Sequence, residues 1–256
     1  NFVAGYDNDV YKEMDHGTNT LSTISMNQPT VFVGTAPKAD FWLLRTEDYS
    51  TESPAEEDFW IAAVEFSDSV GVDIISSSLG YHGFDDISMN YRYSDLNGRT
   101  AAISQAASRL ASKGIILVNS AGNDGMGTWK KINVPADAHD ILTVGAVSLD
   151  KVNAPFSSIG PTADGRIKPD VMAYGCPTNV VSGRGYIIPD NGTSFACPLI
   201  AGMVACLWQA CPNKSAKEIL DIVRQSGNNC QSPDNIMGYG IPDFWSAYQS
   251  ATRYNQ

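Results

Sequence analysis

The segment IILVNSAGNDG, residues 115–125, decides the fold of this chain. It opens on four consecutive apolar residues and continues at once into polar residues and glycine. An apolar run of this length, bounded by turn residues, is typical of a strand that is buried on both faces. Gly114 directly precedes it and is a standard stop for the helix that we expect from about Thr100 to Lys113. The segment therefore predicts a helix, a buried strand and a polar loop in succession.

The same alternation of helices and short apolar strands continues along the chain. Apolar strands that are separated by helices imply a parallel sheet with helices on both faces. We therefore predict one α/β domain over residues 1–256 with a mainly parallel central sheet. The predicted strands are 39–45, 72–75, 115–118 and 141–147, and the predicted helices are 18–26, 53–71, 100–113, 194–210 and 215–226.

The charge balance excludes several classes of partner. The chain has 256 residues, with 17 Lys and Arg against 28 Asp and Glu, which gives a formal net charge of −11. Neutralising nucleic-acid phosphates or anionic lipids requires clustered basic side chains, so neither is expected as a partner. No apolar run approaches the roughly 20 residues of a membrane-spanning helix, so no membrane span is expected.

The five cysteines leave the redox state open. Their spacing lacks the paired CxxC form of a zinc site, and an odd number leaves at least one thiol without a partner in the chain. Buried free thiols are the favoured interpretation, because a core of this size needs no disulfide. A single bridge between Cys211 and Cys230 is the alternative. The cysteines are Cys176, Cys197, Cys206, Cys211 and Cys230.

Three polar clusters, at residues 15–18, 119–125 and 191–198, stand where strands end or helices begin. In parallel α/β sheets, sites lie at the carboxyl ends of strands. His16 is a candidate general base, although a lone histidine is more often a satisfied surface residue. Ser194 is by itself an ordinary helix N-cap, but a nucleophile there would find free backbone N–H groups for an oxyanion. Asn123 is by itself a turn residue, and it could also serve as an amide donor.

In combination, these clusters resemble the motifs of the subtilisin-like serine proteases. His16-Gly17-Thr18 is similar to the histidine motif of that family, Ser120–Gly125 to its oxyanion-asparagine motif, and Gly192–Pro198 to its serine motif. Further similarities occur in the family's order along almost the whole chain, at residues 33–37, 78–80, 156–161 and 164–171. The resemblance implies a subtilisin-like three-layer fold and a serine endopeptidase.

The resemblance also implies roles for individual residues. Ser194 would attack the scissile carbonyl, His16 would transfer the proton, and the Asn123 side chain with the Ser194 N–H would bind the oxyanion. An extended peptide substrate would add as a strand at the cleft, which the resemblance implies is lined by Ser78, Leu79, Gly80, Ala121 and Gly122. Residues 81–90 and 126–133 form loops on which the depth of the specificity pocket would depend.

One part of the family pattern has no counterpart. The family has a triad Asp at the end of an early strand well upstream of the histidine, but only 15 residues precede His16 here. Asp7 and Asp9 follow no strand, and Asp15 adjoins His16, so we assign the triad Asp to none of them. We expect a separate N-terminal fragment of the same precursor to supply the Asp and at least one strand that this chain lacks. Omission of the start of a longer chain is the alternative.

The expected chemistry requires no cofactor. Calcium is an alternative structural ion that the resemblance brings in, at Asp7-Asn8-Asp9, residues 85–86 or residues 137–140. Solvated acidic loops are the favoured interpretation, because no spacing there is diagnostic of a metal site, and metal ligands stay unassigned. Cys197 is expected to pack in the core rather than to act as a redox-sensitive site.

Two other functions compete with the endopeptidase. The first is a non-catalytic relative that kept the fold as a binding module, against which the intact His16, Asn123 and Ser194 argue. The second is an acyl hydrolase such as an esterase, which the same nucleophile could support. Family resemblance also implies secretion or residence in the cell envelope.

Overall fold

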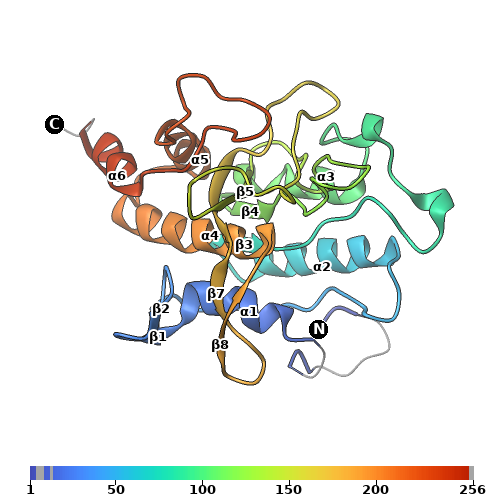
Figure 1. Ribbon diagram of the computed structural model, residues 1–256, viewed down its shortest axis with the longest axis horizontal. Helices are drawn as coiled ribbons and strands as arrows, with labels where there is room; N and C mark the ends of the chain where they lie inside the picture. Colours follow the sequence, from blue (N-terminus) through green and yellow to red (C-terminus); the bar gives the residue numbers. More distant parts are fainter. Residues whose placement is uncertain (4–8, 12–13, 254–256) are drawn as a thin grey trace.

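A four-stranded parallel sheet forms the centre of the molecule. The computed structural model describes residues 1–3, 9–11 and 14–253. The strand order is β3-β4-β5-β6, and every neighbouring pair is parallel (Figure 1). The bounds are β3 Ile74–Ser77, β4 Ile116–Ser120, β5 Leu142–Ser148 and β6 Val171–Cys176. The predicted strand at 115–118 is thus confirmed as the second strand of a parallel sheet.

Alternate side chains of β4 enter two different hydrophobic cores. Ile116 and Val118 belong to the core that contains α4 (Thr193–Ala210), while Leu117 belongs to the core that contains Trp60 of α2 (Ala55–Ser69). Every residue of β4 is buried, so this strand contributes side chains to a core on each face of the sheet. The predicted three-layer α/β arrangement is therefore confirmed.

Each core has its own set of helices. The α4 side also contains residues of α1 (His16–Ser25), α5 (Ala216–Gln225) and α6 (Phe244–Arg253). The α2 side contains α3 (Ala102–Ala107), which is followed by the short 3₁₀ turn Leu110–Lys113. Figure 1 shows α4 lying across the sheet, where it contacts all four strands.

Local sequence signals account for the start of α5 and for the end of the 3₁₀ turn after α3. Ser215 and Glu218 form the predicted reciprocal capping box at the start of α5. Gly114 ends the 3₁₀ turn with φ of +86°, a conformation that glycine adopts without strain. The single helix predicted over 100–113 is instead α3 followed by that 3₁₀ turn. The predicted end at Gly114 is confirmed, but the helix is not continuous.

The strand predicted at residues 39–45 is not formed. These residues belong to no sheet, and Phe41, Trp42 and Leu43 are 39%, 61% and 38% exposed. A β-strand depends on hydrogen bonds to a neighbouring strand, and none of the strands in the described residues pairs with this segment. Trp42 packs edge-on against Phe66 of α2, with ring centroids 5.3 Å apart.

Two small antiparallel pairs flank α1. One pairs β1 (Asn27–Gln28) with β2 (Phe32–Val33), and the other pairs β7 (Thr178–Val181) with β8 (Ile187–Asp190). The β7–β8 hairpin is anchored to α1 because Val181 N donates to Ser22 Oγ at 2.9 Å. The end of β8 thereby comes close to the beginning of α1. Two 3₁₀ turns, Ile87–Met89 and Tyr93–Asp95, lie in the loop after β3.

The structure also bears on the predicted state of the cysteines and on the expected absence of a membrane span. All five cysteines are free thiols, and Cys211 is not bonded to Cys230, but the favoured interpretation of buried thiols holds only for Cys197 and Cys211. Among the described residues, α4 is the one helix that is long and apolar enough to cross a membrane, and 56% of this 18-residue helix is buried inside the protein.

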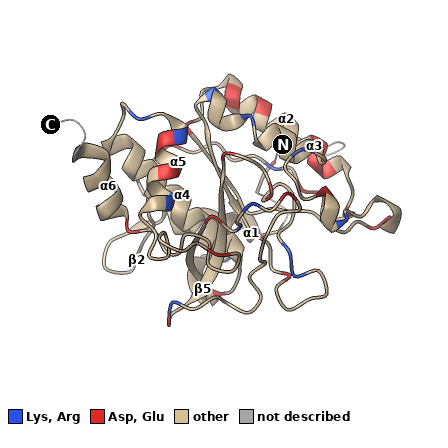
Figure 2. Cartoon of the chain, turned by 90° about the horizontal axis from the view of Figure 1, so that it is seen from above, with Lys and Arg blue, Asp and Glu red and all other residues tan. Residues whose placement is uncertain are grey.

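Acidic residues gather on α2, whose first turn contains Glu56, Glu57 and Asp58 (Figure 2).

Candidate active site

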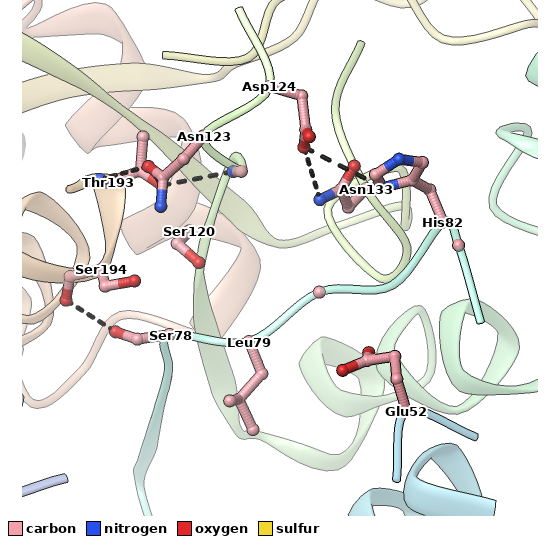
Figure 3. A pocket seen from close by; sticks show the side chains of 13 residues that line it. Glu52, Ser78, Leu79, His82, Ser120, Asn123, Asp124, Asn133, Thr193 and Ser194 are labelled. Atoms are coloured by element: carbon pink, nitrogen blue, oxygen red, sulfur yellow. Dashed lines mark hydrogen bonds and ion pairs between the residues drawn. The ribbon is translucent and has the colours of Figure 1, made fainter. Parts of the chain in front are cut away.

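Ser194 and Asn123 line one cavity at the carboxyl edge of the sheet. Ser194 lies in the first turn of α4, and Asn123 lies three residues beyond the end of β4. The cavity has a volume of about 350 Å³. Six of the residues that we predicted for catalysis or substrate binding line it, as Figure 3 shows for those it labels: Ser78, Leu79, Gly80, Gly122, Asn123 and Ser194.

The side chain of Asn123 is held in one orientation by Thr193. Asn123 Oδ1 accepts hydrogen bonds from Thr193 N at 2.9 Å and from Thr193 Oγ1 at 3.0 Å. Because both bonds engage the oxygen, the NH₂ group turns the other way, and Figure 3 shows it pointing into the space beside Ser194 and Ser120. The amide is thus oriented as a donor in advance of any ligand.

The first turn of α4 adds a second donor. The backbone N–H of Ser194 has no acceptor among the described residues, as expected for the first turn of a helix. The positive end of the helix dipole, from an 18-residue helix, also favours negative charge at this point. Ser78 Oγ donates to the carbonyl of Ser194 at 2.7 Å, which ties this turn to the segment after β3.

His16 lies at the other side of the Ser194 turn, at the N-terminus of α1. Its ring lies 6.2 Å from that of Phe195, measured between centroids. Burial lowers the pKa of the His16 imidazole below its usual 6.5, while the nearby charges of Asp190 and Asp15 act to raise it. His16 is not among the residues that line the cavity.

The candidate acids near His16 do not orient its ring. Within residues 1–3, 9–11 and 14–253, no carboxylate is hydrogen-bonded to the imidazole. Asp15 Oδ2 instead accepts from Gly183 N at 3.0 Å, and Asp9 Oδ1 accepts from Tyr11 N at 2.7 Å. Asp7 lies outside the described residues.

The segment after β3 is the exposed edge of the sheet at the cavity. In the described residues β3 pairs with β4 alone, so its other edge is unpaired. Ser78, Leu79 and Gly80 continue that edge along the cavity. An extended peptide can hydrogen-bond to such an edge as an added strand.

Ala121 lies in the core and does not line the cleft, whereas Cys197 lies in the core as expected. Ala121, which we expected to line the cleft, is fully buried and packs with the α2-side core, because its side chain points away from the cavity that Gly122 borders. Cys197 is fully buried, with Sγ 3.2 Å from the carbonyl oxygen of Val118. Burial raises the pKa of the Cys197 thiol to about 12, so it packs as an uncharged group.

Carboxylates in the acidic loops that the structure describes are engaged by protein groups. Asp86 Oδ1 accepts from Ser88 N, Asp140 pairs with Lys217, and both oxygens of the buried Asp137 accept hydrogen bonds from protein groups. In the described part of the chain, no three His, Cys, Asp or Glu side chains are grouped to hold a metal. The segment Asp7-Asn8-Asp9 falls partly outside the described residues.

Seven further residues line the cavity, and the sequence motifs gave none of them an individual role. Their signal was indirect, since three belong to the loops 81–90 and 126–133 that we expected to set the depth of the pocket, and three belong to the serine and asparagine motifs. They are Glu52, His82, Gly83, Ser120, Asp124, Asn133 and Thr193.

The arrangement of Ser194 and Asn123 at the cavity agrees with a family match that covers most of the sequence. Residues 3–240 match the profile of the subtilase family. The chain belongs to this family. The family match and its subtilisin homologues identify a serine endopeptidase, a hydrolase of peptide bonds.

Individual subtilases resemble the chain at a moderate level. It is 28% identical to subtilisin DY from Bacillus licheniformis over 217 residues, which cover 84% of this chain and 70% of that protein. It is 29% identical to subtilisin NAT from Bacillus subtilis subsp. natto over 222 residues, covering 86% of this chain. The chain spans 52% of the length of subtilisin NAT.

The fold is also that of solved subtilisin-like proteases. The self-cleaved protease domain of PatA superposes with a TM-score of 0.75 at 22% identity, covering 92% of this chain and 83% of that one. A structure of MycP1 from the ESX-1 type VII secretion system gives a TM-score of 0.73 at 21% identity, covering 91% and 70% respectively. At such identities the likeness concerns the fold.

Proposed function

We propose that this subtilase cleaves peptide bonds through an acyl-enzyme formed on Ser194. The observation that carries the proposal is the cavity in which Ser194 stands beside an Asn123 amide already oriented by Thr193. Such an arrangement suits acyl transfer, in which a negative oxygen develops on the attacked carbonyl.

In the first step, Ser194 Oγ attacks the carbonyl carbon and His16 accepts the hydroxyl proton. The carbonyl oxygen becomes an oxyanion, which accepts hydrogen bonds from the Asn123 NH₂ group and the Ser194 N–H. Collapse of this intermediate breaks the peptide bond, and His16 donates its proton to the leaving amine. The acyl group stays on Ser194 as an ester.

In the second step, water takes the place of the amine. His16 accepts a proton from the water, whose oxygen attacks the ester carbonyl in the same oxyanion site. The ester bond breaks, Ser194 recovers its proton, and the acid product leaves. Protein groups carry all of these steps, so the proposed chemistry uses no cofactor.

The substrate would bind in extended form along the unpaired edge after β3. Ser78, Leu79 and Gly80 would then pair with the peptide backbone on the acyl side of the scissile bond. This placement would bring the attacked carbonyl between Ser194 and Asn123. A protein or peptide is accordingly the proposed substrate.

We further propose that the acid of the triad lies on an N-terminal segment outside this chain. The support is twofold: none of the described carboxylates is hydrogen-bonded to His16, and the apolar segment Phe41–Leu43 is exposed, with no partner among the strands of the described residues. A strand that covered this segment could carry an Asp towards the imidazole. The whole would form one catalytic domain, with a secreted or cell-envelope location by family resemblance.

Labelling with a fluorophosphonate tests the nucleophile. We expect one covalent adduct per molecule, mapped to Ser194 by peptide mass spectrometry, because the probe needs an activated serine and an oxyanion site. The Ser194→Ala variant should give no adduct. An adduct on another serine, or equal labelling of the variant, would refute the assignment.

Intact mass spectrometry of the labelled enzyme from its natural source tests the second proposal. We expect upstream sequence of the same precursor, with an Asp, either as a bound second chain or as an extension of this one. Full labelling of a preparation that contains only residues 1–256 would show that no outside acid is required.

A further inference from the structure

The cavity beside Ser194 has unusually polar walls. Of the thirteen side chains or glycines that line it, only Leu79 is apolar, whereas small-molecule and side-chain pockets are lined predominantly by apolar groups. Two carboxylates, Asp124 and Glu52, are among the lining residues, and none of the lining residues that the structure describes is a lysine or an arginine. An apolar substrate side chain would therefore leave these polar groups without partners.

Asn133 closes one end of the cavity. It is only 7% exposed, and its Oδ1 has no hydrogen-bond partner among the described residues. Gly80 and Gly122 border it so closely that a Cβ on Gly80 would lie 3.0 Å from Asn133 Cβ and one on Gly122 would lie 2.9 Å from Asn133 Nδ2. Gly122 also has φ of +108°, which favours glycine. The absence of these two side chains lets both backbone segments pack close against Asn133.

Asp124 provides the negative charge next to Asn133. Its Oδ2 accepts a hydrogen bond from Asn133 Nδ2 at 3.0 Å, and its side chain remains 28% exposed. Figure 3 shows the two side chains facing each other on the wall opposite Leu79. An acceptor that lacks a donor and a reachable carboxylate thus lie side by side.

His82 is the one lining side chain that can become cationic. Its Nδ1 lies 4.0 Å from Asp124 Oδ2, and its ring is stacked on that of Trp129 with centroids 4.8 Å apart. The stacking holds the imidazole at the side of the cavity.

A neighbouring cavity is also lined by acidic side chains. It has a volume of about 320 Å³ and shares Glu52 and Leu79 with the first. Four more carboxylates line it and no Lys or Arg does among the residues described: Glu47, Asp48, Glu56 and Asp85. A cationic group that approaches Ser194 along this side would therefore be attracted over the whole path.

We propose that the cavity beside Ser194 binds the side chain of a lysine or arginine, with Asp124 as the counter-charge and Asn133 Oδ1 as a hydrogen-bond acceptor. The side chain that enters belongs to the residue whose carbonyl is attacked, because the same cavity holds Ser194 and Asn123. This inference rests on the proposed protease function and makes the enzyme one that cleaves after basic residues. Asp124 and Asn133 are then specificity-determining residues.

Peptide binding to the Ser194→Ala variant tests the inference without turnover. Two peptides of the same sequence would end either in arginine or in citrulline, which has the same shape but no charge. We expect the arginine peptide to bind at least about tenfold more tightly by titration calorimetry, because only it meets the carboxylate with a charge. A lysine peptide should also bind more tightly than its neutral norleucine counterpart. Equal affinities, tighter binding of the neutral peptides, or no binding of either would overturn the proposal.

Variants of the pocket identify the residue responsible. Asp124→Asn, made in the same Ser194→Ala background, keeps the shape of the side chain and should bring the ratio of the two affinities close to one. The matched control is Asp150→Asn, which removes one exposed carboxylate that lines neither cavity and should leave the ratio unchanged. If Asp124→Asn keeps the arginine preference, Asp124 is not the counter-charge.

The outcomes for this inference and for the proposed function can be distinguished. Fluorophosphonate labelling of Ser194 with no preference for the arginine peptide would refute the specificity alone. A strong arginine preference in a protein whose Ser194 is never labelled would refute the protease function and leave a pocket that binds basic side chains.

Discussion

At the scale of single residues, the site depends on a side chain that is oriented before any substrate arrives. Thr193 uses its backbone N–H and its hydroxyl to hold Asn123 Oδ1. Its Oγ1 also accepts a hydrogen bond from Gly122 N at 3.3 Å. Thr193 is fully buried, so these bonds do not compete with water. Donors fixed in this way need no reorganisation when negative charge develops.

Substitutions of Asn123 and Thr193 should lower kcat to different degrees. The loss of one such amide donor costs about 10²–10³ in kcat, a cost known from a subtilisin, and we expect it for Asn123→Ala. Thr193→Val removes one of the two bonds that orient the amide, so a loss of about tenfold is expected. Steady-state kinetics on a peptide substrate measure both, with KM nearly unchanged. A rise in KM at constant kcat would contradict a role in the transition state.

The charge on Asp190 should control the titration of His16. Burial lowers the imidazole pKa below 6.5, and the negative charge of Asp190 acts against this shift. The neutral imidazole, which is the form that accepts a proton, therefore predominates at pH 7. Asp190→Asn should lower the pKa further, which ¹H NMR titration of the ring can measure. Asp150→Asn should leave it unchanged, and a rise of the His16 pKa in Asp190→Asn would contradict the argument.

At the scale of elements, α4 connects the site to the core. Its N-terminus presents Ser194 and its body packs on all four strands of the sheet. Gly202, in the middle of the helix, allows the loop after β2 to approach closely, since a Cβ there would overlap Thr35 Oγ1 and lie 2.9 Å from Thr35 Cβ. The helix thus has a glycine where alanine would be the better helix former.

Two glycine-to-alanine substitutions in helices should have opposite effects on stability. Gly202→Ala should lower the free energy of unfolding by about 1–2 kcal/mol, because the clash with Thr35 outweighs the gain in helix propensity. Gly17→Ala in α1 has no atom within 4 Å of the added Cβ and should raise it by about 0.5–1 kcal/mol. Urea unfolding measures both. Stabilisation by Gly202→Ala would show that α4 can move away from Thr35 at little cost.

At the scale of the whole molecule, the net charge of −11 is unevenly distributed. Carboxylates collect in the two adjoining cavities and on α2, and some of them are buried. Burial raises the pKa of Glu47 to about 7, while its hydrogen bond from Tyr81, at 2.5 Å, acts to lower it. Since Glu56 and Glu52 also raise this pKa, the cluster couples the protonation of the groove to the stability of the fold.

Glu47 should make the molecule less stable as the pH rises. Its pKa is about 7 in the folded protein and near 4.5 in the unfolded chain, so the folded state binds more protons between these values. The favourable contribution is full below about pH 4.5 and is lost as the pH rises through 7. Glu47→Gln, which does not titrate, should therefore gain on the order of 2 kcal/mol relative to the unmodified chain between pH 5 and pH 8.

Urea unfolding at pH 5 and pH 8 measures this difference. The exposed Glu65→Gln on α2 is the matched control and should show the same difference from the unmodified chain at both pH values. If Glu47→Gln and Glu65→Gln behave alike, Glu47 is not protonated by the fold.

The sequence by itself determined the layers of the fold and placed the candidate reacting groups at the ends of its elements. The continuous apolar run at 115–118 could only be buried on both faces, and the motifs around His16, Asn123 and Ser194 placed polar groups at the ends of such elements. These features are local, because periodicity and helix ends depend on neighbours along the chain.

Only the tertiary structure decided how the cavity is lined and which strands pair. Residues 39–45 have the composition of a strand, but strand formation depends on a partner elsewhere in space, and none of the strands in the described residues pairs with the segment. The bond between Asn133 and Asp124, and the orientation of Asn123 by Thr193 some 70 residues away, likewise depend on the paths of separate loops. Side-chain contacts between distant segments are set by packing, so no pattern within a single segment could reveal the polar, negatively charged pocket beside Ser194.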